Sequence, residues 1–267
     1  MSFKELEEIV EDILLSSKYK NINKRTISEI AKIESCKYKG KKSLVKAIKN
    51  KLHQIYGAFL TERDIEKINR LLDVLETDSR TLKETSKKIL LLHCSTRERI
   101  ESYETLYREI FSLTGSPKSI LDLACGFNPY SIPWMDICGP IEYYAYDIDS
   151  LLIESINRFL GMINYPKLAI VKDIIFEDVE EYGDVCFIFK FLPTAERVKK
   201  GASIELLEKI KSQFIIVSFP LKSIGGKRKG MLENYSKIFE PVFTQRYIIM
   251  KRFILEEEVF YILRRGK

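Results

Sequence analysis

The spacing of apolar residues along the chain changes at Gly115-Ser116-Pro117. Up to that point apolar side chains recur every three or four residues, as in Leu44, Ile48 and Leu52, and no proline occurs before Pro117. This pattern predicts amphipathic helices over residues 3–15, 26–35, 43–60, 62–76 and 81–93. After it, short β-rich runs alternate with helical stretches. The chain is therefore expected to join a helical N-terminal part to an α/β part.

The second part is predicted to form a mostly parallel, doubly wound sheet with an antiparallel hairpin at one edge. Its β-rich runs lie at 119–123, 141–146, 168–172, 185–189 and 214–219, with helices expected at 95–114, 131–137, 149–161, 194–211 and 230–239. Two further runs, 246–254 and 257–263, leave no room for a long helix between them. We therefore expect a helical domain at residues 1–95 and an α/β domain with a seven-stranded sheet at residues 96–267.

Composition excludes several classes of protein. The five cysteines are scattered without Cys-x-x-Cys spacing and there are only two histidines, so neither a disulfide framework nor a metal site is expected. No apolar run approaches the roughly 18 residues that a membrane span needs. The charged, amphipathic N-terminus has no signal-peptide hydrophobic segment, so a cytoplasmic protein is expected.

Positive charge is concentrated near the N-terminus. The chain carries a net charge of +6, and the stretch Lys18–Lys51 contains twelve basic residues but only two acidic ones, Glu29 and Glu34. Such a concentration is typical of a surface that binds a phosphate backbone. A solvated helical face fits the same run equally well, because charge patterning alone is a weak signal.

The loop after the first predicted strand reads Asp122-Leu-Ala-Cys-Gly-Phe-Asn-Pro129. Gly126 would let the backbone approach a ligand closely, and Asp122 could accept hydrogen bonds from loop amides or, through water, from a ligand ammonium group. Asn128 takes the place of a second glycine, since asparagine also tolerates left-handed backbone angles. An ordinary strand-to-helix turn with an Asn-Pro helix start is the alternative interpretation.

Two further carboxylates follow the next two predicted strands. Asp147 comes about 20 residues after Gly126, the spacing at which an acid contacts the ribose hydroxyls of a nucleotide-like ligand. Asp149 competes for that role, but its position is typical of a helix N-cap. Asp173 could accept a hydrogen bond from the adenine amine, or could cap a turn. Because parallel strands end at one edge of a sheet, Asp122, Asp147 and Asp173 are expected to lie near one another.

The loop 122–129 resembles motif I of class I methyltransferases, and the terminal hairpin is similar to the ending of their sheet. This resemblance implies a Rossmann-like fold with S-adenosylmethionine as cofactor. An Asp/Asn-Pro-Pro-Tyr/Phe clamp for amine methylation is missing at Phe189-Lys-Phe-Leu-Pro-Thr194. A nucleophile for cytosine C5 is also missing, since Cys186 lies inside a strand and Cys125 in the cofactor loop. Elimination therefore favours a ring nitrogen with its own lone pair, such as guanine N7.

Four segments resemble the aminoglycoside-resistance 16S rRNA methyltransferases that modify guanine N7 at nucleotide 1405. They are Lys51-Leu-His-Gln-Ile-Tyr-Gly57, His93-Cys-Ser-Thr-Arg-Glu-Arg99, Leu121–Met135 and Ser218–Tyr235. The resemblance covers nearly the whole chain. It implies that Arg99 binds the methionyl carboxylate of the cofactor, and that Asp147 and Asp173 contact its ribose and adenine. The full set of cofactor residues it implies is His93, Ser95, Thr96, Arg99, Asp122, Ala124, Gly126, Asn128, Asp147, Ile148, Asp173, Ile174, Phe189 and Lys190.

The same resemblance implies that the chain docks on the assembled 30S subunit through residues 1–95 and acts as a monomer. Lys222 and Met231 are candidates in the loop that covers the target nucleotide. The RNA-binding candidates are Lys20, Lys49, Lys51, His53, Lys222, Lys227, Arg228 and Lys229. Two alternatives stay open: methylation of N1 of adenosine 1408, and a catalytically silent RNA-binding or ribosome-assembly factor with this fold.

Overall fold

The computed structural model describes residues 2–55, 61–75, 78–222 and 230–266. Within them, seven strands form one sheet in the order β3-β2-β1-β4-β5-β7-β6. Five strands are parallel, and β7 pairs antiparallel with both β5 and β6. The strands are β1 (Ser119–Leu123), β2 (Glu142–Asp147), β3 (Ala169–Val171), β4 (Tyr182–Phe189), β5 (Lys211–Pro220), β6 (Tyr247–Leu255) and β7 (Glu258–Arg265). The predicted seven-stranded sheet with its terminal hairpin is confirmed.

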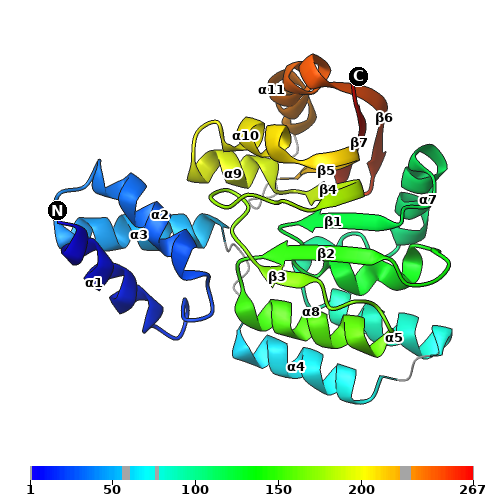
Figure 1. The fold of residues 1–267 in the computed structure, drawn as a ribbon, viewed down its shortest axis with the longest axis horizontal. Coiled ribbons are helices and arrows are strands. Elements are labelled where there is room, and N and C mark those ends of the chain that lie inside the picture. Colours follow the sequence, from blue (N-terminus) through cyan, green and yellow to red (C-terminus); the bar gives the residue numbers. More distant parts are fainter. Residues whose placement is uncertain (1, 56–60, 76–77, 223–229, 267) are drawn as a thin grey trace.

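Helices cover both faces of this sheet (Figure 1). Side chains along β4 alternate between two cores, with Val185 and Phe187 in one and Cys186 and Ile188 in the other, because successive residues of a strand point to opposite faces. The first core is shared with α4 (Glu62–Asp73), α5 (Ser79–Leu90), α7 (Tyr103–Thr114) and α8 (Ser150–Met162). The second is shared with α10 (Ala202–Lys209) and α11 (Met231–Arg246).

Three N-terminal helices form a separate cluster, at the blue end of Figure 1. They are α1 (Phe3–Leu14), α2 (Lys24–Ser35) and α3 (Lys41–Ile55). Their apolar stripes pack together and against residues of α9 (Leu192–Val198) such as Ala195 and Val198. Because α4 and α5 instead share the first core of the sheet, the packing favours a domain division between α3 and α4. The boundary at residue 95 stays a prediction.

Several predicted helices are shorter or divided. The helix expected at 95–114 is two, α6 (Cys94–Arg97) and α7, and the one expected at 194–211 is α9 and α10, separated at Gly201 with φ 84°. The helix expected at 131–137 is the 3-10 helix η1 (Asn128–Trp134). Pro133, which has no backbone N–H to donate, lies within η1.

Candidate active site

The loops that follow β1, β2, β3 and β4 gather at one edge of the sheet. The parallel register pairs Leu123 of β1 with Tyr146 of β2, and Asp147 of β2 with Val171 of β3. Asp122, Asp147 and Asp173 therefore lie at the carboxyl ends of three neighbouring strands, as the sequence predicted. Open α/β sheets bind their ligands at such an edge.

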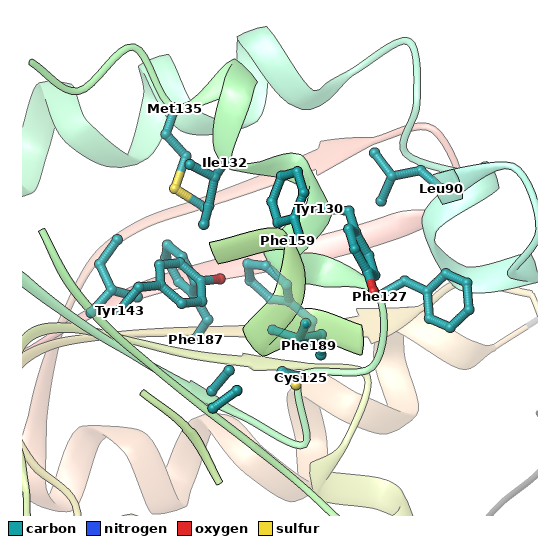
Figure 2. Close-up of a cluster of buried hydrophobic side chains, with 14 of the residues drawn as sticks. Leu90, Cys125, Phe127, Tyr130, Ile132, Met135, Tyr143, Phe159, Phe187 and Phe189 are labelled. Atoms are coloured by element: carbon teal, nitrogen blue, oxygen red, sulfur yellow. The ribbon is translucent and has the colours of Figure 1, made fainter. Parts of the chain in front are cut away.

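The loop after β1 turns sharply through two left-handed residues, Ala124 with φ 53° and Gly126 with φ 50°. A side chain at Gly126 would meet no atom of the described chain within 4 Å, so the loop presents bare backbone there. Left-handed angles are costly for alanine and concentrate at functional sites. Beyond the turn, Phe127 and Tyr130 enter the hydrophobic core together with Leu90 and Phe159 (Figure 2), which anchors the loop from below.

Asp122 is buried and hydrogen-bonded within the protein. Its Oδ2 accepts hydrogen bonds from Tyr143 Oη at 2.6 Å and from Asn128 Nδ2 at 2.9 Å. Burial raises the pKa of Asp122 to about 7, against these hydrogen bonds, which favour the ionised form. Asp122 therefore supports the loop from beneath.

The expected left-handed conformation of Asn128 is wrong. Asn128 begins η1 and has no positive φ. Its side chain is 2% exposed and lies between Asp122 and Arg99, whose Nη1 donates to Asn128 Oδ1 at 3.4 Å. An asparagine suits this position because its amide both donates and accepts, so it connects an acid to a base.

Asp147 holds the two cofactor-edge loops together. Its Oδ2 accepts from the Gly126 amide at 3.0 Å, and its Oδ1 accepts from the Ile148 amide at 2.7 Å. The side chain is partly exposed, and burial raises its pKa. Asp149 is the N-cap of α8 and accepts from the Leu152 amide at 2.9 Å, which confirms its predicted N-cap position.

Asp173 is a turn cap and a contact to the N-terminal helices. Its Oδ1 accepts from the Ile175 amide at 2.9 Å, and its Oδ2 accepts from the Thr26 hydroxyl at 2.6 Å. The pKa of Asp173 is raised, because the effect of burial exceeds the opposing effect of the hydrogen bond from Thr26. Ile174, which follows, is buried at the same edge, while Ile148 after β2 is partly exposed.

Arg99 lies buried beside the motif loop and is 5% exposed. Its Nε donates to Glu258 Oε2 at 2.8 Å and its Nη2 to Ser95 Oγ at 3.1 Å. The guanidinium also lies over the ring of Phe189, 4.8 Å from the centroid. Burial opposes the charge, but Glu258 raises the pKa of Arg99 above its ordinary value. The site therefore holds a permanent cation with a planar set of donors.

Lys190 adds a second cation next to Arg99. It has a left-handed backbone, with φ 57°, and its Nζ lies 2.6 Å from Glu98 Oε2 and 3.2 Å from Glu258 Oε2. Ser218 at the end of β5 donates its hydroxyl to Glu258 Oε1 and accepts from the Lys190 amide at 3.0 Å. Glu258 thus joins four side chains of the site: Arg99, Lys190, Ser218 and, through Lys190, Glu98.

His93 caps the start of α6, and its Nδ1 is buried without a hydrogen-bond partner in the described residues. Burial, together with the nearby charge of Arg99, lowers its pKa to about 4. The ring is tilted on Phe127, 5.1 Å between centroids. Thr96 supports the turn by donating to the Leu90 carbonyl at 2.7 Å. An unpaired buried polar atom beside a buried cation indicates a place for a polar ligand group.

Three of the five RNA-binding candidates within the described residues, Lys49, Lys51 and His53, belong to α3. Exposed Lys49 has no ion-pair partner in the described chain and lies with Lys42, Lys46 and His53 on one face of α3. Lys20 pairs with Glu62, and Lys51 donates to the Arg197 carbonyl. Lys222 is exposed, and Met231 starts α11 packed against the second core. Lys227, Arg228 and Lys229 lie outside the described residues.

Glu258 and Tyr143 are site residues that the sequence analysis missed. A charged residue at the start of the apolar run Val259–Leu263 was the available signal for Glu258. Tyr143 inside β2 gave no signal, because an aromatic residue in a strand is ordinary. In the ranges described, no three histidine, cysteine or acidic side chains come together to hold a metal. No helix in those ranges has the length and apolar character of a membrane span.

Comparison with known proteins gives consistent matches over the whole chain. Residues 15–262 match the family described as Ribosomal RNA methyltransferase (FmrO). The chain is similar to the 16S rRNA (guanine(1405)-N(7))-methyltransferases of Proteus mirabilis, at 34% identity with 97% of each chain covered, and of Micromonospora rosea, at 31% identity with 97% and 96% covered. It is also similar to the structure of the 16S rRNA methyltransferase RmtF in complex with S-adenosyl-L-homocysteine, with a TM-score of 0.86, 25% identity and all of both chains covered.

Proposed function

Because this chain belongs to the ribosomal RNA methyltransferase (FmrO) family, as its sequence segments predicted, we propose that it methylates N7 of guanosine 1405 in 16S rRNA. The geometry of the site supports this proposal independently of family membership. Arg99 and Asp147 both hydrogen-bond to the loop after β1, at Asn128 and Gly126. A cation and a carboxylate therefore flank this loop, and they complement the methionyl carboxylate and the ribose hydroxyls of S-adenosylmethionine.

The residues at the sheet edge fit that cofactor. The Arg99 guanidinium offers parallel donors to a carboxylate, and His93 Nδ1, buried without a described partner, can pair with a polar group beside it. Asp147 would accept from the ribose hydroxyls and Asp173 from the adenine amine. We propose that these residues act together with Ser95, Thr96, Asp122, Ala124, Gly126, Asn128, Ile148, Ile174, Phe189 and Lys190.

The proposed target needs no catalytic base from the chain. When bound, S-adenosylmethionine supplies an electrophilic methyl group, and guanine N7 attacks with a lone pair that carries no proton. Cys125 and Cys186 are buried, and burial raises both thiol pKa values well above the ordinary value, so neither is suited to act as a nucleophile. The work of the chain is to position the base, with Lys222 and Met231 as candidates for contacting the flipped nucleotide.

We propose the assembled 30S subunit as the binding partner, recognised by a monomer in the cytoplasm. The exposed face of α3 with Lys42, Lys46 and Lys49 can contact phosphates, and Lys20, Lys51, His53, Lys222, Lys227, Arg228 and Lys229 complete the proposed RNA contacts. Methylation inside the decoding site would make cells that express the chain resistant to aminoglycosides.

The test is to incubate purified chain with 30S subunits and S-adenosylmethionine, then cleave the RNA with borohydride and aniline before primer extension. Cleavage at guanosine 1405 is expected, because N7-methylguanosine is the base that this chemistry opens. A stop at adenosine 1408 without aniline would indicate N1 methylation instead. Cofactor binding without any modification would support the silent-factor alternative.

A further inference from the structure

The segment between α1 and α2 is joined to the loop after β2 by backbone hydrogen bonds. The Asn23 amide donates to the Ile148 carbonyl at 2.8 Å, and the Ser150 amide donates to the Asn21 carbonyl at 2.9 Å. Between them, Ile22 forms an isolated antiparallel bridge with Asp149. The segment between α1 and α2 therefore contacts the loop that directly follows Asp147.

A second contact reaches the loop after β3. The hydroxyl of Thr26, in the first turn of α2, donates to Asp173 Oδ2 at 2.6 Å, and the two residues are 0% and 3% exposed. Asp173 Oδ1 accepts from the Ile175 amide, so each carboxylate oxygen has one donor and the carboxylate cannot rotate freely. Each oxygen has two lone pairs, so each oxygen of Asp173 can still accept another donor.

Glu177 strengthens this contact from the opposite side. Its Oε1 accepts from Asn23 Nδ2 and from the Asp173 amide, both at 3.0 Å, and its Oε2 lies 3.7 Å from Arg25. The start of α2 thus holds the backbone as well as the side chain of Asp173. Thr26 and Asp173 are 147 residues apart in the sequence, so this contact exists only in the folded protein.

We propose that Thr26 is a positioning residue for adenine recognition. Its hydroxyl orients Asp173 so that a free lone pair of the carboxylate accepts a hydrogen bond from the exocyclic amine of the adenine ring. The inference rests on the proposed function for the identity of the cofactor. It follows that the helix bundle that carries the lysine face of α3 also completes the adenine end of the cofactor site.

The test compares two ligands by calorimetry on the full chain: S-adenosylhomocysteine, and S-inosylhomocysteine, which has an oxygen in place of the amine. Thr26→Val is expected to weaken S-adenosylhomocysteine binding about tenfold, as loss of one charged hydrogen bond does, and to leave S-inosylhomocysteine binding equal or tighter. An equal loss for both ligands, or no change for either, would overturn the proposal.

Two further variants separate positioning from folding. Thr26→Ser keeps the hydroxyl and should restore the preference for the amine. Asp173→Asn should remove that preference, and adding Thr26→Val to it should cost nothing more, because the two residues act through one interaction. Additive losses in the double variant would contradict this. If the unmodified chain binds no S-adenosylhomocysteine, the proposed function itself fails, and the inference with it.

Discussion

Arg99 and Glu258 form a buried ion pair, with 2.8 Å between Nε and Oε2 and side-chain exposures of 6% and 3%. They are 159 residues apart and join α6–α7 to the start of β7. Nη1 of Arg99 donates to Asn128 Oδ1 at 3.4 Å, and Nη2 donates to Ser95 Oγ at 3.1 Å. Glu258 thus holds the guanidinium in place by its Nε side, and we propose that the two terminal nitrogens bind the methionyl carboxylate of the cofactor.

Removing Glu258 should destabilise the fold. Glu258→Ala leaves Arg99 charged and buried without its partner, which costs about 3–5 kcal/mol in comparable pairs. Denaturant unfolding of Glu258→Ala and of the unmodified chain measures this difference in the free energy of unfolding. Glu84→Ala is the matched control, since Glu84 pairs with Arg80 on the surface, where such pairs are worth less than about 1 kcal/mol. Equal effects of the two substitutions would contradict the assigned importance of Glu258.

Arg99 should be essential for methylation, whereas the nearby Arg97 should not be. Arg99→Ala is expected to abolish activity, but it also leaves Glu258 unpaired. Arg99→Lys is therefore the more informative variant, because it keeps the positive charge and removes the planar set of guanidinium donors. We expect cofactor affinity to fall about tenfold or more by calorimetry, in line with loss of a charge-assisted hydrogen bond. Arg97→Ala, on the exposed side of α6, should retain full activity, and full activity of Arg99→Lys would refute the carboxylate assignment.

Asp147 and Asp149, at the end of β2 and just after it, should respond differently to the same substitution. Asp147→Asn replaces the acceptor of the Gly126 and Ile148 amides and is expected to weaken cofactor binding at least about tenfold. Asp149→Asn should leave both binding and thermal stability close to those of the unmodified chain, because asparagine caps helices as well as aspartate. The reverse ranking in calorimetry would show that Asp149 contacts the ribose.

Charge reversal on α3 should weaken binding to the 30S subunit without affecting the cofactor. Lys49→Glu removes one proposed phosphate contact, so the slope of log affinity against log salt should become shallower by about one. Filter binding at several salt concentrations measures the slope. Lys118→Glu is the control, since Lys118 precedes β1 at the opposite end of the strands. A loss of cofactor affinity in Lys49→Glu would instead indicate misfolding.

His93 should make stability depend on pH between about 4 and 6.5. Its folded-state pKa is lowered to about 4, so in this range the unfolded chain takes up a proton that the folded chain does not. The contribution of His93 is therefore fully present above pH 6.5 and is lost as the pH falls, with a loss of about 2 kcal/mol by pH 5. Unfolding free energies of the unmodified chain and His93→Gln, measured from pH 7 to 5, should converge. Parallel curves would contradict this, because they would show that folding leaves the pKa of His93 unchanged.

Much of the fold follows from patterns that are local in the sequence. Apolar spacing alone separates the helical part from the α/β part, and the two final runs, with no room for a helix between them, require a hairpin. Two predicted helices differ from the structure for local reasons or in type: Gly201, with a left-handed backbone, lies between α9 and α10, and the helix expected at 131–137 is the 3-10 helix η1. The packing of α4 and α5 against the sheet could not be predicted in this way. An amphipathic stripe predicts that one face of a helix is buried, but it does not specify which element that face packs against.

The sequence by itself determined the strand ends, the motif loop and the family, because strand order places Asp122, Asp147 and Asp173 at one edge whatever their side chains do. Only the tertiary structure decided what each carboxylate touches. Asp122 accepts a hydrogen bond from Tyr143, Asp173 accepts one from Thr26, and Arg99 forms an ion pair with Glu258. These partners are 21, 147 and 159 residues apart, and a hydrogen bond depends on distances of about 3 Å that no spacing along the chain encodes.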